Sequence, residues 1–203
     1  MANRRRRSRL NPRKLPAQSR STATVDAVLE AAARILERHG FERYTTNEIA
    51  ERAGVSIGSL YQYFPNKDAV TVALLERETV ELLADIASMP SEEGYEAGLG
   101  HIIRSVVANQ MRRPKLARLL DFEESRLPIR SPSGDLDDVL LTVLIRVLSQ
   151  PDVQIDEDVE IAAFDVLAIV KGMVDAAGEY EETNAPQLER RVRRAVFGYL
   201  GVR

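Results

Sequence analysis

Three residues between positions 57 and 64, next to a glycine, carry side-chain groups that can read the edges of DNA bases. Leu60 and Phe64 lie four positions apart, so in a helix they share one apolar face. The positions that then point outward are Gly58, Ser59, Tyr61 and Gln62. Hydroxyl, phenol and amide groups beside a glycine suit the major groove, where hydrogen bonds distinguish base pairs. The spacing therefore predicts a short helix whose outer face contacts DNA.

A second short helix and a tight turn are expected just before this one. Thr45 and Glu48 match a capping box at the start of that helix. Gly54 can adopt the left-handed conformation that reverses the chain. Ser56 is a second N-cap, and Val55 and Leu60 occupy the positions of a hydrophobic staple. The pattern predicts a helix-turn-helix.

The stretch from Thr45 to Lys67, TTNEIAERAGVSIGSLYQYFPNK, resembles the DNA-binding signature of the TetR (tetracycline-repressor) family of transcriptional regulators. The resemblance extends from about Val25 to Leu75. It implies DNA contacts at or near Thr45, Thr46, Ser56, Ile57, Gly58, Ser59, Tyr61, Gln62, Tyr63 and Lys67. Tyr63 stands where many members have His, and Ser59 stands where Thr is common. The operator preference of other members therefore does not carry over.

The charge is concentrated at one end of the chain. Residues 1–25 hold eight Lys and Arg side chains and no acid, whereas the whole chain has a net charge of −3. Residues 1–20 are rich in Arg, Pro and Ser, which predicts a disordered arm. Arg4, Arg5, Arg6 and Arg7 are its candidate DNA contacts, at phosphates or in a minor groove. The alternative is a solvated leader that adds little.

The composition of the chain argues against several other classes of protein and of binding site. The chain has no Cys, which excludes disulfides and thiolate metal sites, and its two His offer no obvious nucleophile–base pair. No Gly-rich phosphate loop or calcium-loop spacing is present. We expect no enzyme activity, no metal and no cofactor. Since no apolar run reaches the length of a membrane span and no signal peptide is evident, a cytoplasmic protein without membrane contact is expected.

Apolar periodicity of the helical kind continues along the chain, and no segment alternates with period two. The first helix is expected to begin after a cap at Thr24 and to end at Gly40. A long helix is expected over Asp68–Ser88, with Val80 on its apolar face. Further helices are expected over Glu92–Arg112, Lys115–Arg126, Asp135–Ser149, Asp156–Tyr180 and Pro186–Leu200. The predicted class is all-α. We expect a three-helix DNA-binding head over residues 21–67 and a larger helical regulatory and dimerisation domain over 68–203.

The resemblance also implies partners. In the TetR family the last two helices pair with their symmetry mates in a homodimer, and the apolar face Leu188, Val192, Val196 and Tyr199 has the composition for that contact. Members enclose a small molecule in the larger domain. The candidate ligand-binding residues are His101, Arg104, Phe122 and Asp165. Asp165 could instead pair with Arg104 or Lys171, since a buried charge needs a partner.

The sequence thus favours a homodimeric repressor that binds double-stranded DNA at a palindromic operator and is released by an unidentified small-molecule effector. A competing hypothesis is an architectural DNA-binding protein with a basic arm, no inducer and little sequence choice. A nucleic-acid enzyme with an appended helix-turn-helix is disfavoured, because the sequence offers no catalytic cluster.

Overall fold

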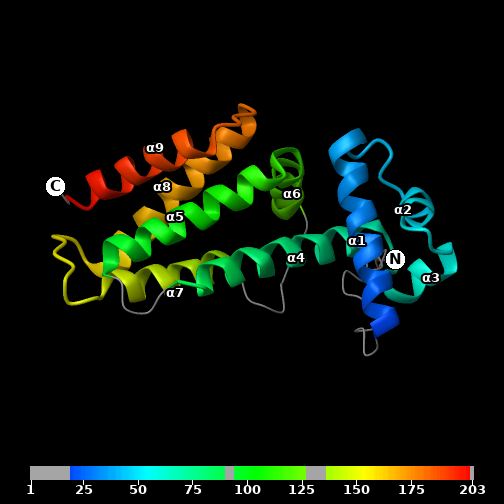
Figure 1. Ribbon diagram of the computed structural model, residues 1–203, viewed down its shortest axis with the longest axis horizontal. Helices are drawn as coiled ribbons and strands as arrows, with labels where there is room; N and C mark the ends of the chain where they lie inside the picture. The colour runs from blue at the N-terminus through cyan, green and yellow to red at the C-terminus, as the bar shows by residue number, and fades with distance from the viewer. Residues whose placement is uncertain (1–18, 90–93, 127–135, 202–203) are drawn as a thin grey trace, which may run out of the picture. The chain divides into compact units, whose positions relative to one another are not determined.

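The computed structural model describes residues 19–89, 94–126 and 136–201. Within these ranges the chain forms nine α-helices and no strand (Figure 1). The predicted all-α class is confirmed. The predicted helix ends agree with the observed ones to within a few residues at most positions, since Pro, Gly and capping side chains mark them in the sequence.

The N-terminal helices are α1 (Ser19–His39), α2 (Thr46–Ala53), α3 (Ile57–Tyr63) and α4 (Lys67–Ala87). The apolar residues Val28, Ala32 and Leu36 of α1 are buried, and Gly40 follows the helix with a φ of +59°. The predicted start of α1 is wrong: Thr24 lies inside the helix, which already includes Ser19 and Arg20. The rest of the predicted arm lies outside the described residues.

The described residues fall into two compact units. The first contains the residues up to Arg77 and the end of α6 (Pro114–Arg126) from Leu119, and the second contains the remainder. The predicted head, 21–67, falls within the first unit. A boundary between residues 67 and 68 stays a prediction.

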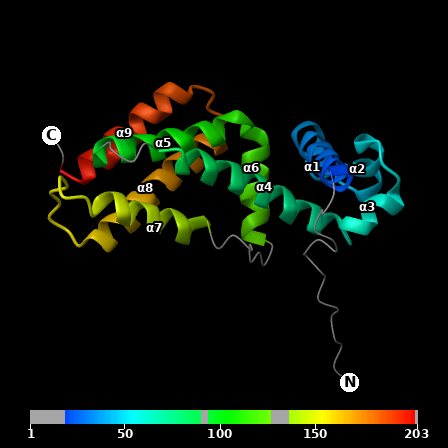
Figure 2. The same cartoon turned by 60° about the horizontal axis from the view of Figure 1, so that its bottom comes forward.

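The second unit is built on α5 (Tyr95–Arg112), α7 (Leu136–Leu148), α8 (Val159–Glu179) and α9 (Ala185–Tyr199). Helices α5 and α8 contact each other, and both contact α7 and α9 (Figures 1 and 2). Asp158 caps α8 by accepting from the backbone N–H of Glu160 at 2.9 Å, and Asn184 caps α9 by accepting from that of Gln187 at 3.1 Å. Local sequence therefore sets where these helices begin.

Burial in the second unit corrects two expectations. In α4, Val80 is exposed whereas Leu82 is buried, so the expectation that Val80 lies on the apolar face is wrong. In α9, Leu188, Val192 and Val196 are completely buried within the single chain. These three residues belong to the chain's own core, and the expectation that they face a second copy is wrong.

Candidate nucleic-acid interface

Capping side chains position α2 at the start of the helix-turn-helix. The Thr45 hydroxyl accepts from the backbone N–H of Glu48 at 3.2 Å, as the capping box requires. The Glu48 carboxylate does not complete the box. It accepts instead from the Arg43 guanidinium at 2.9 Å, so an ion pair fixes the residues before α2. Half of the predicted capping box is present.

The turn between α2 and α3 has the predicted geometry. Gly54 adopts the left-handed conformation, with φ 69° and ψ 28°, and its N–H bonds back to the carbonyls at the end of α2. Ser56 then caps α3 by accepting from the backbone N–H of Ser59 at 3.1 Å. The C-cap Gly54 of α2 and the N-cap Ser56 of α3 together fix the direction in which α3 leaves the turn.

Helix α3 buries one face and exposes the other. Leu60, within the helix, and Phe64, its C-cap, are fully buried. Gly58, Gln62 and Tyr61, the last with 41% of its surface exposed, face solvent, and so does Ile57. Ser59 and Tyr63 are half-buried, and the Ser59 hydroxyl lies 2.8 Å from that of Ser56. Three of the four predicted outward positions are therefore exposed.

The remaining candidates of the head lie close to α3 in the sequence and the fold. The Tyr61 hydroxyl lies 3.1 Å from the Thr46 hydroxyl, so the first turn of α2 and the exposed face of α3 are joined. Thr45 is exposed at the start of α2, and Lys67 is exposed at the first position of α4. Arg4, Arg5, Arg6 and Arg7 lie outside the described residues.

A buried polar cluster holds the head onto α4 and α6. The Thr71 hydroxyl donates to the hydroxyl of Tyr44 at 3.1 Å, and Glu123 is buried nearby. Burial raises the pKa of the Tyr44 phenol above its ordinary value, and the negative charges of Glu123 and Asp68 add to the effect against the opposing hydrogen bond from Thr71. Tyr44 is therefore a neutral anchor, and its ring meets that of Phe41 edge-on with centroids 5.7 Å apart.

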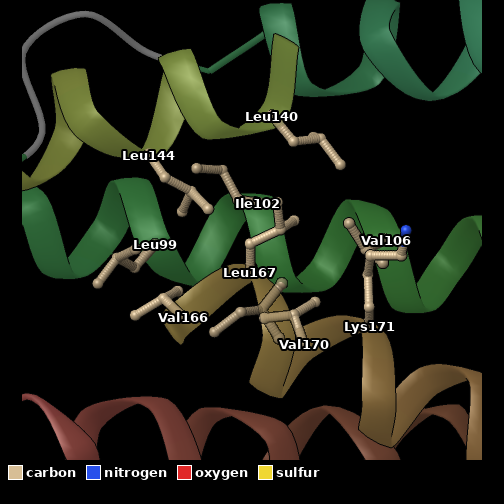
Figure 3. A pocket seen from close by; sticks show the side chains of 10 residues that line it. Leu99, Ile102, Val106, Leu140, Leu144, Val166, Leu167, Val170 and Lys171 are labelled. Carbon is tan, nitrogen blue, oxygen red and sulfur yellow. The ribbon is translucent and has the colours of Figure 1, made fainter. Parts of the chain in front are cut away.

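The second unit contains an apolar cavity between three helices (Figure 3). Its lining comes from α5 (Leu99, Ile102, Ile103, Val106), α7 (Leu140, Leu144) and α8 (Val166, Leu167, Val170, Lys171). Sequence reasoning did not single out this set. Aliphatic residues that line a cavity have the same periodicity as those that fill a core, so no signal in the sequence separates them.

None of the four predicted ligand-binding residues lines this cavity. His101 contacts the Asp85 carbonyl at 2.8 Å, and Arg104 lies 3.6 Å from Glu189. Phe122 has 63% of its surface exposed. Asp165 accepts from the Tyr199 hydroxyl at 2.7 Å, and this hydrogen bond is the main cause that raises the pKa of Tyr199 to about 12.

The alternative pairing of Asp165 with Arg104 or Lys171 is therefore wrong. A ligand contact at any of the four residues stays a prediction.

Among the described residues, no cluster of three or more His, Cys, Asp or Glu side chains could hold a metal ion. In the same part of the chain, no helix is both long enough and apolar enough to span a bilayer.

Known proteins resemble both parts of the chain. The family model of bacterial regulatory proteins of the tetR family matches residues 28–74, and that of the tetracyclin repressor-like C-terminal domain matches residues 96–200. Nucleoid occlusion factor SlmA of Glaesserella parasuis is 31% identical over 109 residues, which cover 51% of this chain and 54% of that protein. The chain thus spans about half the length of such curated relatives.

Two further proteins match more of the chain. The A-factor receptor protein of Streptomyces griseus is 26% identical over 178 residues, 81% of this chain and 62% of that protein. A TetR transcription regulator from Haloarcula marismortui has a similar fold, with a TM-score of 0.74 at 21% identity over 89% of this chain and 97% of that one.

The C-terminal family model alone matches more than half of the chain, and the N-terminal model matches the helix-turn-helix described above. The protein is therefore a member of the TetR family of DNA-binding transcriptional regulators.

Proposed function

We propose that this protein is a homodimeric repressor that binds a palindromic operator and leaves it when a small molecule enters the helical domain. The observation that carries the proposal is the geometry of α3. This helix buries Leu60 and has Phe64 buried at its C-cap, while it exposes Gly58, Tyr61 and Gln62 after a doubly capped turn. A short, rigidly held helix with a polar outer face has the form of a major-groove reader.

The proposed contacts divide by chemistry. Gln62 has an amide that can pair with an adenine edge, and this contact specifies sequence. Tyr61 and Lys67 carry donors suited to phosphate, which fix the position of the helix. The exposed residues Thr45, Ser56 and Ile57, with the half-buried Thr46, would line the groove beside these contacts. The arm residues Arg4, Arg5, Arg6 and Arg7 would add phosphate or minor-groove contacts.

An exposed apolar face on α8 supports the proposed homodimer. Ile161 and Phe164 expose 58% and 62% of their surfaces, and Ala168 and Gly172 continue the same face at helical spacing. Large apolar groups exposed side by side indicate an interaction surface. A second copy would bury them in an isologous contact, and two heads would then meet the two halves of a palindrome.

Operator footprinting tests the proposal. The full chain is incubated with genomic fragments, and we expect protection of a discrete inverted repeat that Gln62→Ala weakens. Gln154→Ala, which alters an exposed amide in a loop of the second unit, is the matched control and should protect the same site. Protection that spreads along every fragment without a boundary would contradict the proposal and favour an architectural protein with a basic arm.

A further inference from the structure

The cavity between α5, α7 and α8 has an unusual chemical lining. Of the ten described residues that line it, nine are Leu, Ile or Val, and none is aromatic. Such a surface gives no ring for stacking and no hydrogen bond along its length. Its favourable interaction with a guest is therefore the removal of aliphatic surface from water.

Lys171 is the one polar side chain among these ten described residues, and Figure 3 shows it at one end of the cavity beside Val106. Its ammonium donates to both oxygens of Asp137, at 2.8 and 2.6 Å. Both side chains keep somewhat less than half of their surface exposed, so the pair lies at the edge of the cavity. A guest with its chain among the aliphatic residues would bring its end to this ammonium.

The charges around Lys171 decide which end group fits. Asp137 already offsets the lysine charge, and Asp175 follows one turn later on α8. Burial raises the pKa of Asp175, Lys171 opposes that rise, and the negative charges of Asp137 and Glu179 add to it. A carboxylate at this edge would therefore meet acidic neighbours, and an ammonium would meet Lys171. An uncharged acceptor avoids both repulsions, because it adds no charge beside Asp137 or Lys171.

The width of the cavity restricts the shape of the guest. Its volume in this structure is about 20 Å³, room for little more than one water molecule. A ligand must push the lining side chains apart, and an extended chain needs less widening than a flat ring. Entry would thus separate the lining side chains of α5, α7 and α8, and so would alter the packing of the helical unit.

We infer that the effector of this protein is an uncharged aliphatic compound whose single hydrogen-bond acceptor binds the Lys171 ammonium at the edge of this cavity. The inference rests on the proposed function, since it names the chemical class of the effector. Each methylene that enters the widened cavity should improve binding by up to about fourfold. The acceptor should add about tenfold, as expected for one hydrogen bond to a charged donor.

Calorimetry on the full chain without DNA tests the ligand class with hexan-2-one, octan-2-one and decan-2-one. We expect affinity to rise with chain length and decan-2-one to bind more tightly than decanoate or decylamine. Tighter binding of decanoate or decylamine, or affinity that does not depend on chain length, would overturn the inference.

Two variants test the site itself. Lys171→Met keeps the aliphatic stem but removes the donor, and should weaken decan-2-one by about tenfold. Val106→Phe should block the half-buried edge of the cavity and abolish binding. Lys115→Met, at an exposed lysine of α6 outside the cavity, is the matched control and should bind as the parent does. Equal binding by the parent and by both cavity variants would overturn the inference.

Operator release is measured separately, so the two proposals can fail independently. If ketones bind the cavity but do not release the operator, the ligand site stands and the proposed release fails. If another compound releases the operator while no aliphatic ketone binds, the proposed function stands and the inference about the ligand is overturned.

Discussion

At the scale of single residues, Gln62 and Tyr61 are neighbours on α3 with different expected roles. Gln62 is exposed on the outer face, whereas the Tyr61 hydroxyl is tied to that of Thr46 at 3.1 Å. We expect Gln62→Ala to lose about 1–3 kcal/mol of discrimination at one symmetric pair of bases. Tyr61→Phe should weaken all sites alike, because it removes a positioning group. Selection of binding sites from random DNA checks both, and an unchanged site preference for Gln62→Ala would remove that residue from the reading set.

Asp175 should make stability depend on pH. Burial is the main cause that raises its pKa above the ordinary value of 3.8. For an acid with a raised folded-state pKa, the unfolded chain loses its proton first as pH rises, so ionisation favours unfolding above that value. Asp175→Asn should therefore raise the melting temperature near neutral pH, and the gain should shrink as pH falls towards 3.8.

Thermal unfolding across that pH range measures the effect. Asp156→Asn, which removes an exposed carboxylate from the loop before α8, is the control. If the gain in melting temperature of Asp175→Asn does not change with pH, ionisation is not its cause. The substitution would then have relieved an unfavourable packing or hydrogen-bond contact.

At the scale of elements, two glycines in the helix-turn-helix separate folding from DNA contact. Gly54 has a φ of +69°, and a Cβ added there would meet no atom within 4 Å. Gly54→Ala should therefore destabilise the head by about 1–2 kcal/mol through backbone conformation alone.

At Gly58, inside α3, an added Cβ would meet only the Ser56 hydroxyl at 3.9 Å. Gly58→Ala should stabilise the helix by up to about 1 kcal/mol, and should still weaken operator binding because a methyl group then faces the groove.

Unfolding measurements and operator titrations on both glycine variants give the comparison. Operator affinity that survives Gly58→Ala at parental strength would place the first turn of α3 away from the bases. A parental melting temperature for Gly54→Ala would contradict the role assigned to the left-handed turn.

At the scale of the whole molecule, the exposed face of α8 is expected to hold the dimer. Phe164→Asp changes a side chain that is 62% exposed in the single chain, so each chain should stay folded. Two carboxylates at a shared apolar contact should dissociate the dimer, and operator affinity should fall with it. Val196→Asp is the contrast, because Val196 is completely buried and its replacement should unfold the helical unit. Sedimentation reports the oligomeric state of each variant, and circular dichroism reports whether it is folded. A Phe164→Asp variant that remains a dimer would exclude this face of α8 as the dimer contact.

The basic arm gives a prediction that depends on charge alone. Residues 2–14 contain seven of the eight cations of the N-terminal segment. If two or three per chain meet phosphates, deleting residues 2–14 should flatten the log–log salt dependence of binding by roughly 4–5 per dimer. Affinity should fall for operator and random DNA alike, most strongly at low salt. A salt slope that does not change would mean that the arm is a solvated leader.

The sequence by itself determined most of the helices and the helix-turn-helix. Caps such as Thr45 and Ser56, the left-handed Gly54 and the spacing of Leu60 and Phe64 act within a few residues, so their consequences can be read locally. The start of α1 was missed, because no comparable signal marks Ser19.

Only the tertiary structure decided what each apolar face packs against. Val196 and Phe164 are both apolar residues of the last two helices, yet Val196 is core and Phe164 is exposed. The partners of Asp165 and Lys171 are likewise 34 positions away in the chain, at Tyr199 and Asp137. Such contacts depend on how helices distant in sequence come together, and helical periodicity defines the faces of a helix without naming its neighbours. For the same reason, the apolar cavity and its single lysine became visible only in the folded chain.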